Sequence, residues 1–117
     1  MKIIHVDNSD FFRKIMGTFL QKEGYEVEGF DSAQEANLAI GGGGADMVIM
    51  GLTFVDGGGI EFLDKVVESY AGPVIVVSAS LNQQKEEELI DHGAKAAVSK
   101  SGPWQETIRA HLAALKG

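Results

Sequence analysis

The residues whose types and spacing bear most directly on chemistry lie in the stretch Asp46–Gly59. It opens with an apolar run, Met47–Met50, that is short enough for a strand buried on both faces. A loop with three consecutive glycines, Gly57–Gly59, follows, and a helical pattern begins at Ile60. Open α/β sheets bind ligands where such a strand ends in a loop before a helix. Gly51 occupies that strand end and has no side chain, so it supplies no reactive group.

Other residues that could react are scattered along the chain. Thr53 and Asp56 follow the same strand and could supply the reactive group that Gly51 lacks. Thr53 would need a general base, and the sequence does not identify one. We interpret Asp56 as solvated, because it lies in the glycine-rich loop. The three histidines, His5, His92 and His111, are far apart and show no metal-ligand spacing. His5 falls within a strand and is interpreted as a core histidine whose hydrogen bonds are satisfied.

The composition narrows the classes of partner. The chain has 17 acidic and 10 basic residues, a net charge of -7, whereas binding to a phosphate backbone needs clustered lysine and arginine. We therefore expect no nucleic-acid partner. The absence of cysteine excludes disulfides and cysteine-based metal or redox sites. No apolar run approaches the roughly 20 residues of a membrane span, and Asp7 ends the first run too early for a secretory signal. A cytoplasmic protein without membrane contact is expected.

Five short runs rich in β-branched or alternating apolar residues predict strands. They are Lys2–Val6, Glu26–Phe30, Met47–Met50, Val74–Val77 and Ala94–Ser99. Helical patterns follow each run, over about residues 10–23, 32–40, 60–70, 82–92 and 103–115. Strict alternation of strand and helix with short connections predicts a doubly wound α/β fold, with a parallel sheet covered by helices on both faces. One domain over residues 1–117 is expected.

Capping and apolar spacing define these helices. Ser9 or Asp10 is expected to cap the first helix, Gly24 to end it, and Asp31 with Ser32 to cap the second. The helices differ in how many apolar residues are predicted to be buried. They are Phe11, Phe12, Ile15, Met16, Phe19 and Leu20 in the first helix, Ala33, Ala36, Leu38, Ala39 and Ile40 in the second, and only Leu81, Leu89 and Ile90 around the fourth. The fourth helix should therefore be the least firmly packed.

In order and spacing, these segments resemble the receiver domain of two-component response regulators, the flavodoxin-like, chemotaxis-type receiver. The resemblance covers the whole chain. It is carried by the segments Lys2–Ser9, Gly24–Val27, Asp46–Glu61, Val74–Ala79, His92–Ala96 and Val98–Lys100. It implies a (βα)5 fold with strand order 2-1-3-4-5.

The resemblance also implies a chemistry. In receivers, an aspartate at the end of the third strand attacks a phosphoryl donor, acids after the first strand hold Mg²⁺, and a lysine and a hydroxyl residue contact the phosphate. The matching positions here are Gly51 for the phosphoacceptor and Asp7 and Asn8 for the acids. Ser78 and Lys100 match the hydroxyl and the lysine. The expected remnant of the pocket consists of Asp7, Asn8, Thr53, Ser78 and Lys100.

The sequence departs from the receiver pattern at several of these positions. Gly51 removes the nucleophile, and Asn8 leaves Asp7 as the one remaining carboxylate of three, so no metal cofactor is expected beyond weak Mg²⁺ binding at Asp7 and Asn8. Ala97 replaces the switch aromatic. Val55 and Ser101 replace two prolines. Without a phosphate, Lys100 is expected to form a partly buried ion pair with Asp7, and Ser78 to form a local hydrogen bond.

The resulting hypothesis is a degenerate pseudo-receiver, a signalling module that is not an enzyme and acts by protein contacts without phosphorylation. Its partners would be a sensor kinase, an output domain or another signalling protein, and a homodimer is an option. The resemblance places the contact face on the fourth helix, fifth strand and fifth helix, with Lys95, Ala97, Ser99 and Trp104. A partly exposed Trp104 would strengthen this interpretation and a buried one would weaken it.

Two alternatives remain open from the sequence. The chain could be a conventional phospho-accepting response regulator whose aspartate is altered to Gly51. It could also be a flavodoxin-like domain that binds a small molecule beside the glycine-rich loop. Gly57–Gly59 lacks the spacing of a dinucleotide fingerprint, which leaves the second alternative without a named ligand.

Overall fold

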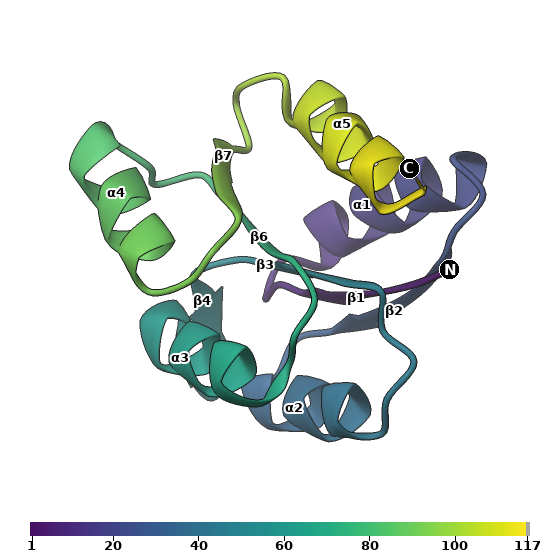
Figure 1. Ribbon diagram of the computed structural model, residues 1–117. Coiled ribbons are helices and arrows are strands. Elements are labelled where there is room, and N and C mark those ends of the chain that lie inside the picture. The colour runs from purple at the N-terminus through teal and green to yellow at the C-terminus, as the bar shows by residue number, and fades with distance from the viewer. Residues whose placement is uncertain (117) are drawn as a thin grey trace.

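A five-stranded parallel sheet forms the centre of the computed structural model, which describes residues 1–116 (Figure 1). Its strands are β1 (Lys2–Val6), β2 (Glu26–Phe30), β3 (Met47–Met50), β6 (Val74–Ser78) and β7 (Ala96–Ser99). Their order across the sheet is β2-β1-β3-β6-β7. Counted along the chain, this is the predicted order 2-1-3-4-5, and the predicted parallel sheet is confirmed.

Helices cover both faces of this sheet (Figure 1). They are α1 (Asp10–Lys22), α2 (Ala33–Gly41), α3 (Gly59–Ser69), α4 (Gln83–Asp91) and α5 (Trp104–Lys116). α1 and α5 lie on one face, and α2, α3 and α4 lie on the other, as the two separate core clusters show. The doubly wound architecture is therefore as predicted. No helix within the described residues 1–116 is long and apolar enough to cross a membrane.

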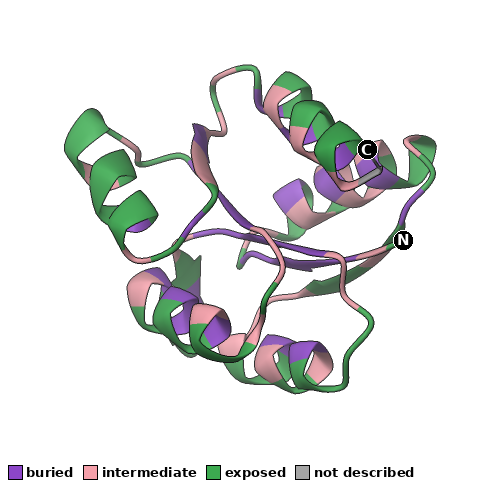
Figure 2. Cartoon of the chain, viewed as in Figure 1, coloured by how far each residue is buried: buried purple, intermediate pink, exposed green. Residues whose placement is uncertain are grey.

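The two core clusters follow from the alternation of side chains along the strands. Ile4, Val48 and Met50 point to the α2, α3 and α4 side, whereas Ile3 and Ile49 point to the α1 and α5 side. Strands β3 and β6 are buried at every position. Burial is thus concentrated in the sheet and on the inner faces of the helices, while their outer faces are exposed (Figure 2).

Predicted caps are confirmed at two helices. The Ser9 side chain caps α1 by accepting a hydrogen bond from the backbone N–H of Phe12, and the Ser32 side chain caps α2 by accepting from that of Glu35. Gly24 follows α1 with a φ of 93°, the left-handed conformation that costs glycine little.

Three predicted buried side chains are exposed instead. Phe11 on α1 is 75% exposed, Leu38 on α2 is 73% exposed, and Ile90 on α4 is 46% exposed. Each lies on the flank of its helix that no neighbouring element covers, and the apolar pattern alone does not reveal which flank that is. Leu89 is the one buried residue of α4, which agrees with the prediction of a weakly packed helix.

The glycine-rich loop also contains regular structure that the sequence did not predict. A two-stranded antiparallel ribbon pairs β4 (Thr53–Phe54) with β5 (Gly57–Gly58). Phe54 is buried and contacts Phe62 of α3, with ring centroids 5.2 Å apart. The segment after β3 is therefore an anchored ribbon that leads into α3 rather than an open loop.

Candidate functional site

The carboxyl ends of four parallel strands meet at one edge of the sheet. Asp7 follows β1, Gly51 follows β3, Ser78 ends β6, and Lys100 follows β7. Backbone hydrogen bonds fix this register, from Gly51 N to Val6 O at 2.8 Å and from Lys100 N to Ser78 O at 2.9 Å. The sheet therefore brings together residues that are up to 93 positions apart in sequence.

These residues line a cavity of about 210 Å³. Its walls are Asp7, Asn8, Gly51, Leu52, Thr53, Val77, Ser78, Ala79, Ser80 and Lys100. All six positions that the sequence assigned to the pocket, the glycine included, are among them. Ser80 also lines the cavity, although no sequence motif indicated it, and its backbone N–H donates to Ser78 Oγ at 3.1 Å.

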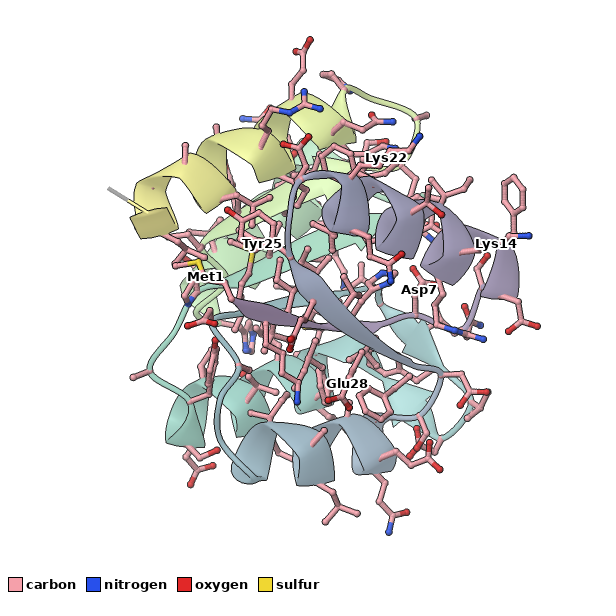
Figure 3. All side chains as sticks on the ribbon, turned by 90° about the vertical axis from the view of Figure 1, so that its right-hand side faces the viewer. Met1, Asp7, Lys14, Lys22, Tyr25 and Glu28 are labelled. Carbon is pink, nitrogen blue, oxygen red and sulfur yellow. The ribbon has the colours of Figure 1, made fainter. Side chains whose placement is uncertain are left out.

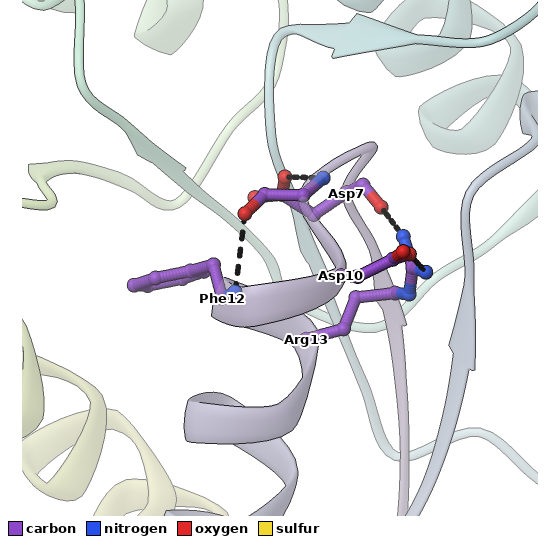
Figure 4. A network of polar contacts seen from close by, with 5 residues as sticks. Asp7, Asp10, Phe12 and Arg13 are labelled. Carbon is purple, nitrogen blue, oxygen red and sulfur yellow. Dashed lines mark hydrogen bonds and ion pairs between the residues drawn. The ribbon is translucent and has the colours of Figure 1, made fainter.

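Asp7 is the buried centre of this cavity, with a side chain that is 2% exposed. Its Oδ1 accepts from the backbone N–H of Ser9 at 2.9 Å, and its backbone oxygen accepts from Arg13 Nη1 at 2.5 Å (Figure 4). Arg13 also pairs with Asp10 in the same network. The start of α1 thus holds the aspartate in place.

The predicted ion pair between Asp7 and Lys100 is present. Lys100 Nζ lies 2.9 Å from Asp7 Oδ2, and the lysine side chain is 22% exposed. The ammonium group also lies 4.3 Å from the centroid of the Phe12 ring, a favourable cation–π distance. Lys100 therefore compensates the charge of a carboxylate that burial would otherwise penalise strongly.

The position of Asp7 is matched to the absence of a side chain at residue 51. A Cβ atom built on Gly51 would lie 3.0 Å from Asp7 Oδ2 and 3.3 Å from Asp7 Cγ. Both distances are shorter than ordinary van der Waals contact. The aspartate carboxylate thus lies against the glycine, and a Cβ atom there would require a shift of a few tenths of an ångström.

Ser78 forms a local hydrogen bond, as the sequence predicted, because its hydroxyl accepts from Ser80 N. The residue itself is buried. Asn8 and Thr53 are exposed at the rim of the cavity. The pocket therefore has a buried ion pair at its base and neutral polar groups around its opening.

These residues do not fit the Mg²⁺ site that a receiver fold implies. Mg²⁺ is held by carboxylate oxygens and water in near-octahedral geometry, but Asp7 is engaged by Ser9 and Lys100, and Gly51 offers no ligand. Within the part of the chain whose side chains are described, no three His, Cys, Asp or Glu residues cluster as metal ligands.

The prediction that His5 is hydrogen-bonded is wrong. His5 is 1% exposed, yet neither ring nitrogen has a hydrogen-bond partner among the residues that the structure describes. Its ring packs edge-on against Phe12, with centroids 5.9 Å apart. Burial lowers the pKa of His5 to about 4, although Asp7 opposes this shift. The sequence did not reveal this because a strand position does not show whether a partner reaches the ring.

The prediction that Asp56 is solvated is confirmed, but the sequence did not reveal the hydrogen bonds that its carboxylate accepts. Asp56 is exposed, but its carboxylate accepts from Ser32 Oγ at 3.0 Å, Ala33 N at 2.8 Å and Gln34 N at 3.0 Å. The hydrogen bonds from the backbone of Ala33 and Gln34 lower its pKa. The ribbon after β3 is thereby tied to the N-terminus of α2, a contact over more than 20 residues that no local pattern predicts.

The four residues of the expected interaction face differ in how far they are exposed. Lys95 is exposed, Ala97 and Ser99 are half-buried, and Trp104 is only 5% exposed. Trp104 packs edge-on against Phe12 and Phe19, with centroids 5.2 Å and 5.4 Å away. A tryptophan committed to the core in this way weakens the case for a contact face centred on it.

The fold is shared with known receivers. The N-terminal receiver domain of Klebsiella pneumoniae RstA, in its BeF3-activated form, superposes with a TM-score of 0.91 at 15% identity, over 100% of each chain. The chemotaxis response regulator CheY4 of Vibrio cholerae superposes with a TM-score of 0.83 at 25% identity, over 97% of each chain.

Sequence comparison leads to the same family. The KDP operon transcriptional regulatory protein KdpE of Escherichia coli (strain K12) is 30% identical over 113 residues, which cover 94% of this chain and 50% of KdpE. This chain therefore spans half the length of that relative. The sequence pattern of the response regulator receiver domain matches residues 3–112. Sequence and fold together show that this protein belongs to the response regulator receiver domain family.

Proposed function

We propose that this receiver domain accepts no phosphoryl group and signals through contacts with another protein. The observation that carries the proposal is the closed arrangement at the end of β3. Gly51 presents no nucleophile, and the buried carboxylate of Asp7 lies against it while paired with Lys100 at 2.9 Å. The lysine that receivers use to pair with phosphate is already engaged, so the pocket has neither acceptor nor free cation at its base.

No neighbouring residue takes over the acceptor role in a way that the geometry supports. The carboxylate of Asp56 accepts three hydrogen bonds from the start of α2. Thr53 is exposed, and no general base in the described part of the chain contacts its hydroxyl. Asp7 is buried and its charge is compensated by Lys100. Because phosphoryl transfer depends on positioned charge around an exposed nucleophile, these residues make poor substitutes.

A contact function is what remains for a receiver without phosphorylation chemistry. Receiver domains interact with sensor kinases and output domains, and we propose a partner of one of these kinds. The cavity beside Gly51, at about 210 Å³, is below the usual range of roughly 300–1,000 Å³ for small-molecule pockets. This size does not favour a flavodoxin-like ligand there.

The direct test is incubation of the chain with acetyl phosphate and Mg²⁺, followed by intact-protein mass spectrometry, with an active receiver domain treated in parallel. We expect this chain to keep its mass while the active receiver gains a phosphoryl group. A stable mass increase on this chain, at any residue, would overturn the proposal.

Two variants separate this proposal from a conventional regulator with an altered acceptor. We expect Gly51→Asp to remain unmodified, because the added side chain displaces Asp7 and the second metal-binding acid is still missing. Phosphorylation of Gly51→Asp, or of Gly51→Asp combined with Asn8→Asp, would show that the rest of the pocket is intact. That result would favour the conventional alternative.

A further inference from the structure

Helix α4 is held to the rest of the molecule mainly near its C-terminal end. Leu89 is its one buried residue, and most of the remaining helix is exposed (Figure 2). Helix α1, by contrast, buries three residues beneath an outer side on which Lys14 and Lys22 are exposed (Figure 3). Because an element with few buried apolar contacts opens locally at low cost, α4 is easier to detach than α1.

The C-terminal end of α4 meets α3 through two contacts. His92 is the C-cap residue of α4, and its Nδ1 lies 2.7 Å from Asp64 Oδ1 on α3. The next residue, Gly93, lies against Val67 of α3, since a Cβ atom built on Gly93 would be 2.9 Å from Val67 Cγ1. The ion pair therefore joins α4 to α3 at the same end of the helix as the buried Leu89.

The strength of this link depends on one proton. A protonated His92 carries a positive charge that the carboxylate of Asp64 attracts, and it lies at a helix C-terminus, where backbone carbonyl groups favour a cation. A neutral ring keeps at most a hydrogen bond from Nδ1. Histidine is the side chain whose ordinary pKa places its change of charge nearest to neutral pH. The link therefore changes in strength within the physiological range.

Three acidic groups favour the proton on the ring. Asp64 on α3 accepts a hydrogen bond from it, and Glu88 and Asp91 on α4 add negative charge. The hydrogen bond to Asp64 is the main cause that raises the pKa of His92 above its ordinary value of 6.5. Glu88 is itself paired with Lys85, whose Nζ lies 3.2 Å from Glu88 Oε1. Among the side chains that the structure describes, His92 is the one basic group that pairs with Asp64.

We propose that His92 and Asp64 form a pH-sensitive switch, which holds α4 against α3 when the ring is protonated and loosens α4 when the ring is neutral. The ion pair stabilises the attachment of α4 fully below the ordinary histidine pKa of 6.5, and this contribution is lost as pH rises through the raised pKa. The inference goes beyond the proposed function, because a proton on His92 gives the domain an input that needs no phosphoryl group.

The test is amide hydrogen exchange of the full chain between about pH 6 and about pH 8.5, followed residue by residue by NMR. Each rate is divided by the intrinsic exchange rate at that pH, so that only the protection by structure remains. We expect the protection of the α4 amides to fall about two- to fivefold over this range, which is the effect of one exposed ion pair.

Matched variants assign the effect to this pair. We expect Asp64→Asn to remove the pH dependence and to leave α4 at the lower protection, because an amide forms no ion pair. His92→Arg keeps a positive charge throughout and should hold α4 firmly at every pH tested. The control is His111→Gln on α5, which lies on the other face of the sheet and should behave as the wild type does.

The same NMR spectra report the proton on the ring directly. The pKa of His92 should fall in Asp64→Asn, because the hydrogen bond to Asp64 is the main cause of its raised value. Both exchanged side chains are partly exposed, so these substitutions carry little risk to folding.

Any of three results would refute the switch. They are α4 protection that does not change with pH in the wild type, an unchanged pH dependence in Asp64→Asn, and a pH dependence that persists in His92→Arg. Each would show that other groups hold α4. The samples contain no phosphoryl donor, so phosphorylation of the chain in the earlier test would refute the proposed function without deciding this one.

Discussion

At the scale of single residues, Gly51, Asp7 and Lys100 form one unit. The carboxylate of Asp7 lies 3.0 Å from where a Cβ atom at residue 51 would be, and the ammonium group of Lys100 neutralises it there. Burying a charge without a partner is far more costly than burying a matched pair. The charges of the three residues are therefore balanced without a metal ion or a phosphate.

This arrangement predicts how substitutions at Gly51 affect stability. In urea denaturation with EDTA at neutral pH, Gly51→Asn should lower the free energy of unfolding by about 1–3 kcal/mol, because its side chain crowds Asp7. Gly51→Asp has the same shape but adds a second carboxylate, and should lose about 1 kcal/mol more. If the aspartate variant is as stable as the asparagine variant, or Mg²⁺ restores it selectively, the pocket still accommodates a receiver-type acid pair.

His5 gives a second prediction at this scale. Its pKa is lowered to about 4 by burial, below the ordinary value of 6.5, so the unfolded chain takes up this proton at a higher pH than the folded one. Stability should therefore fall as pH drops below 6.5, with the full penalty reached below about 4. The loss from this group between pH 7 and 4.5 is about 2 kcal/mol.

The matched variant for this prediction is His5→Phe, which keeps a ring against Phe12 and removes the titrating nitrogens. Carboxylates titrate in both proteins, so the difference in unfolding free energy between them isolates the histidine. Parallel pH dependence of the two proteins in urea denaturation would show that His5 gains a partner or a proton in the folded state.

At the scale of elements, the β4–β5 ribbon depends on a contact with α2. The carboxylate of Asp56 supplies acceptors to the first backbone N–H groups of this helix, which have no partners within the helix itself. Val55 N also donates to Asp31 O at 3.1 Å. Strand β3 is thus followed by a ribbon whose position is fixed relative to α2.

We expect Asp56→Asn to lower the melting temperature by a few degrees at neutral pH, because an amide has one acceptor oxygen where the carboxylate has two. The pKa of Asp56 is lowered in the folded chain, so its contribution is present above the ordinary carboxyl range and is lost as pH falls through the lowered pKa. Differential scanning calorimetry at neutral and acidic pH measures this, with the exposed Glu68→Gln as the control. An equal effect of both variants would mean that Asp56 contributes only its charge.

At the scale of the whole molecule, the two sides of the sheet have different surfaces. α1 presents the exposed Phe11 beside the exposed Lys14 and Lys22, whereas α4 presents glutamates over a single buried leucine. The overall charge of -7 is therefore distributed unevenly between the two sides of the sheet.

The sequence alone determined the positions of the five sheet strands and five helices, because their apolar periods and capping residues are local signals. With right-handed crossovers, the alternation of these elements fixed a parallel doubly wound sheet. The sequence also determined that residue 51 has no side chain and that Asp7, Ser78 and Lys100 follow strand ends. The make-up of the pocket was therefore predictable.

Only the tertiary structure decided which side chains are buried and which hydrogen-bond partners they have. In α1, the six apolar residues divide into a buried row of Phe12, Met16 and Leu20 and an outer row that begins with the exposed Phe11. The missing partner of His5, the bonds of Asp56 to α2 and the burial of Trp104 depend equally on contacts distant in sequence. Periodicity shows that a side chain can be buried, but whether it is buried depends on which other element packs against it.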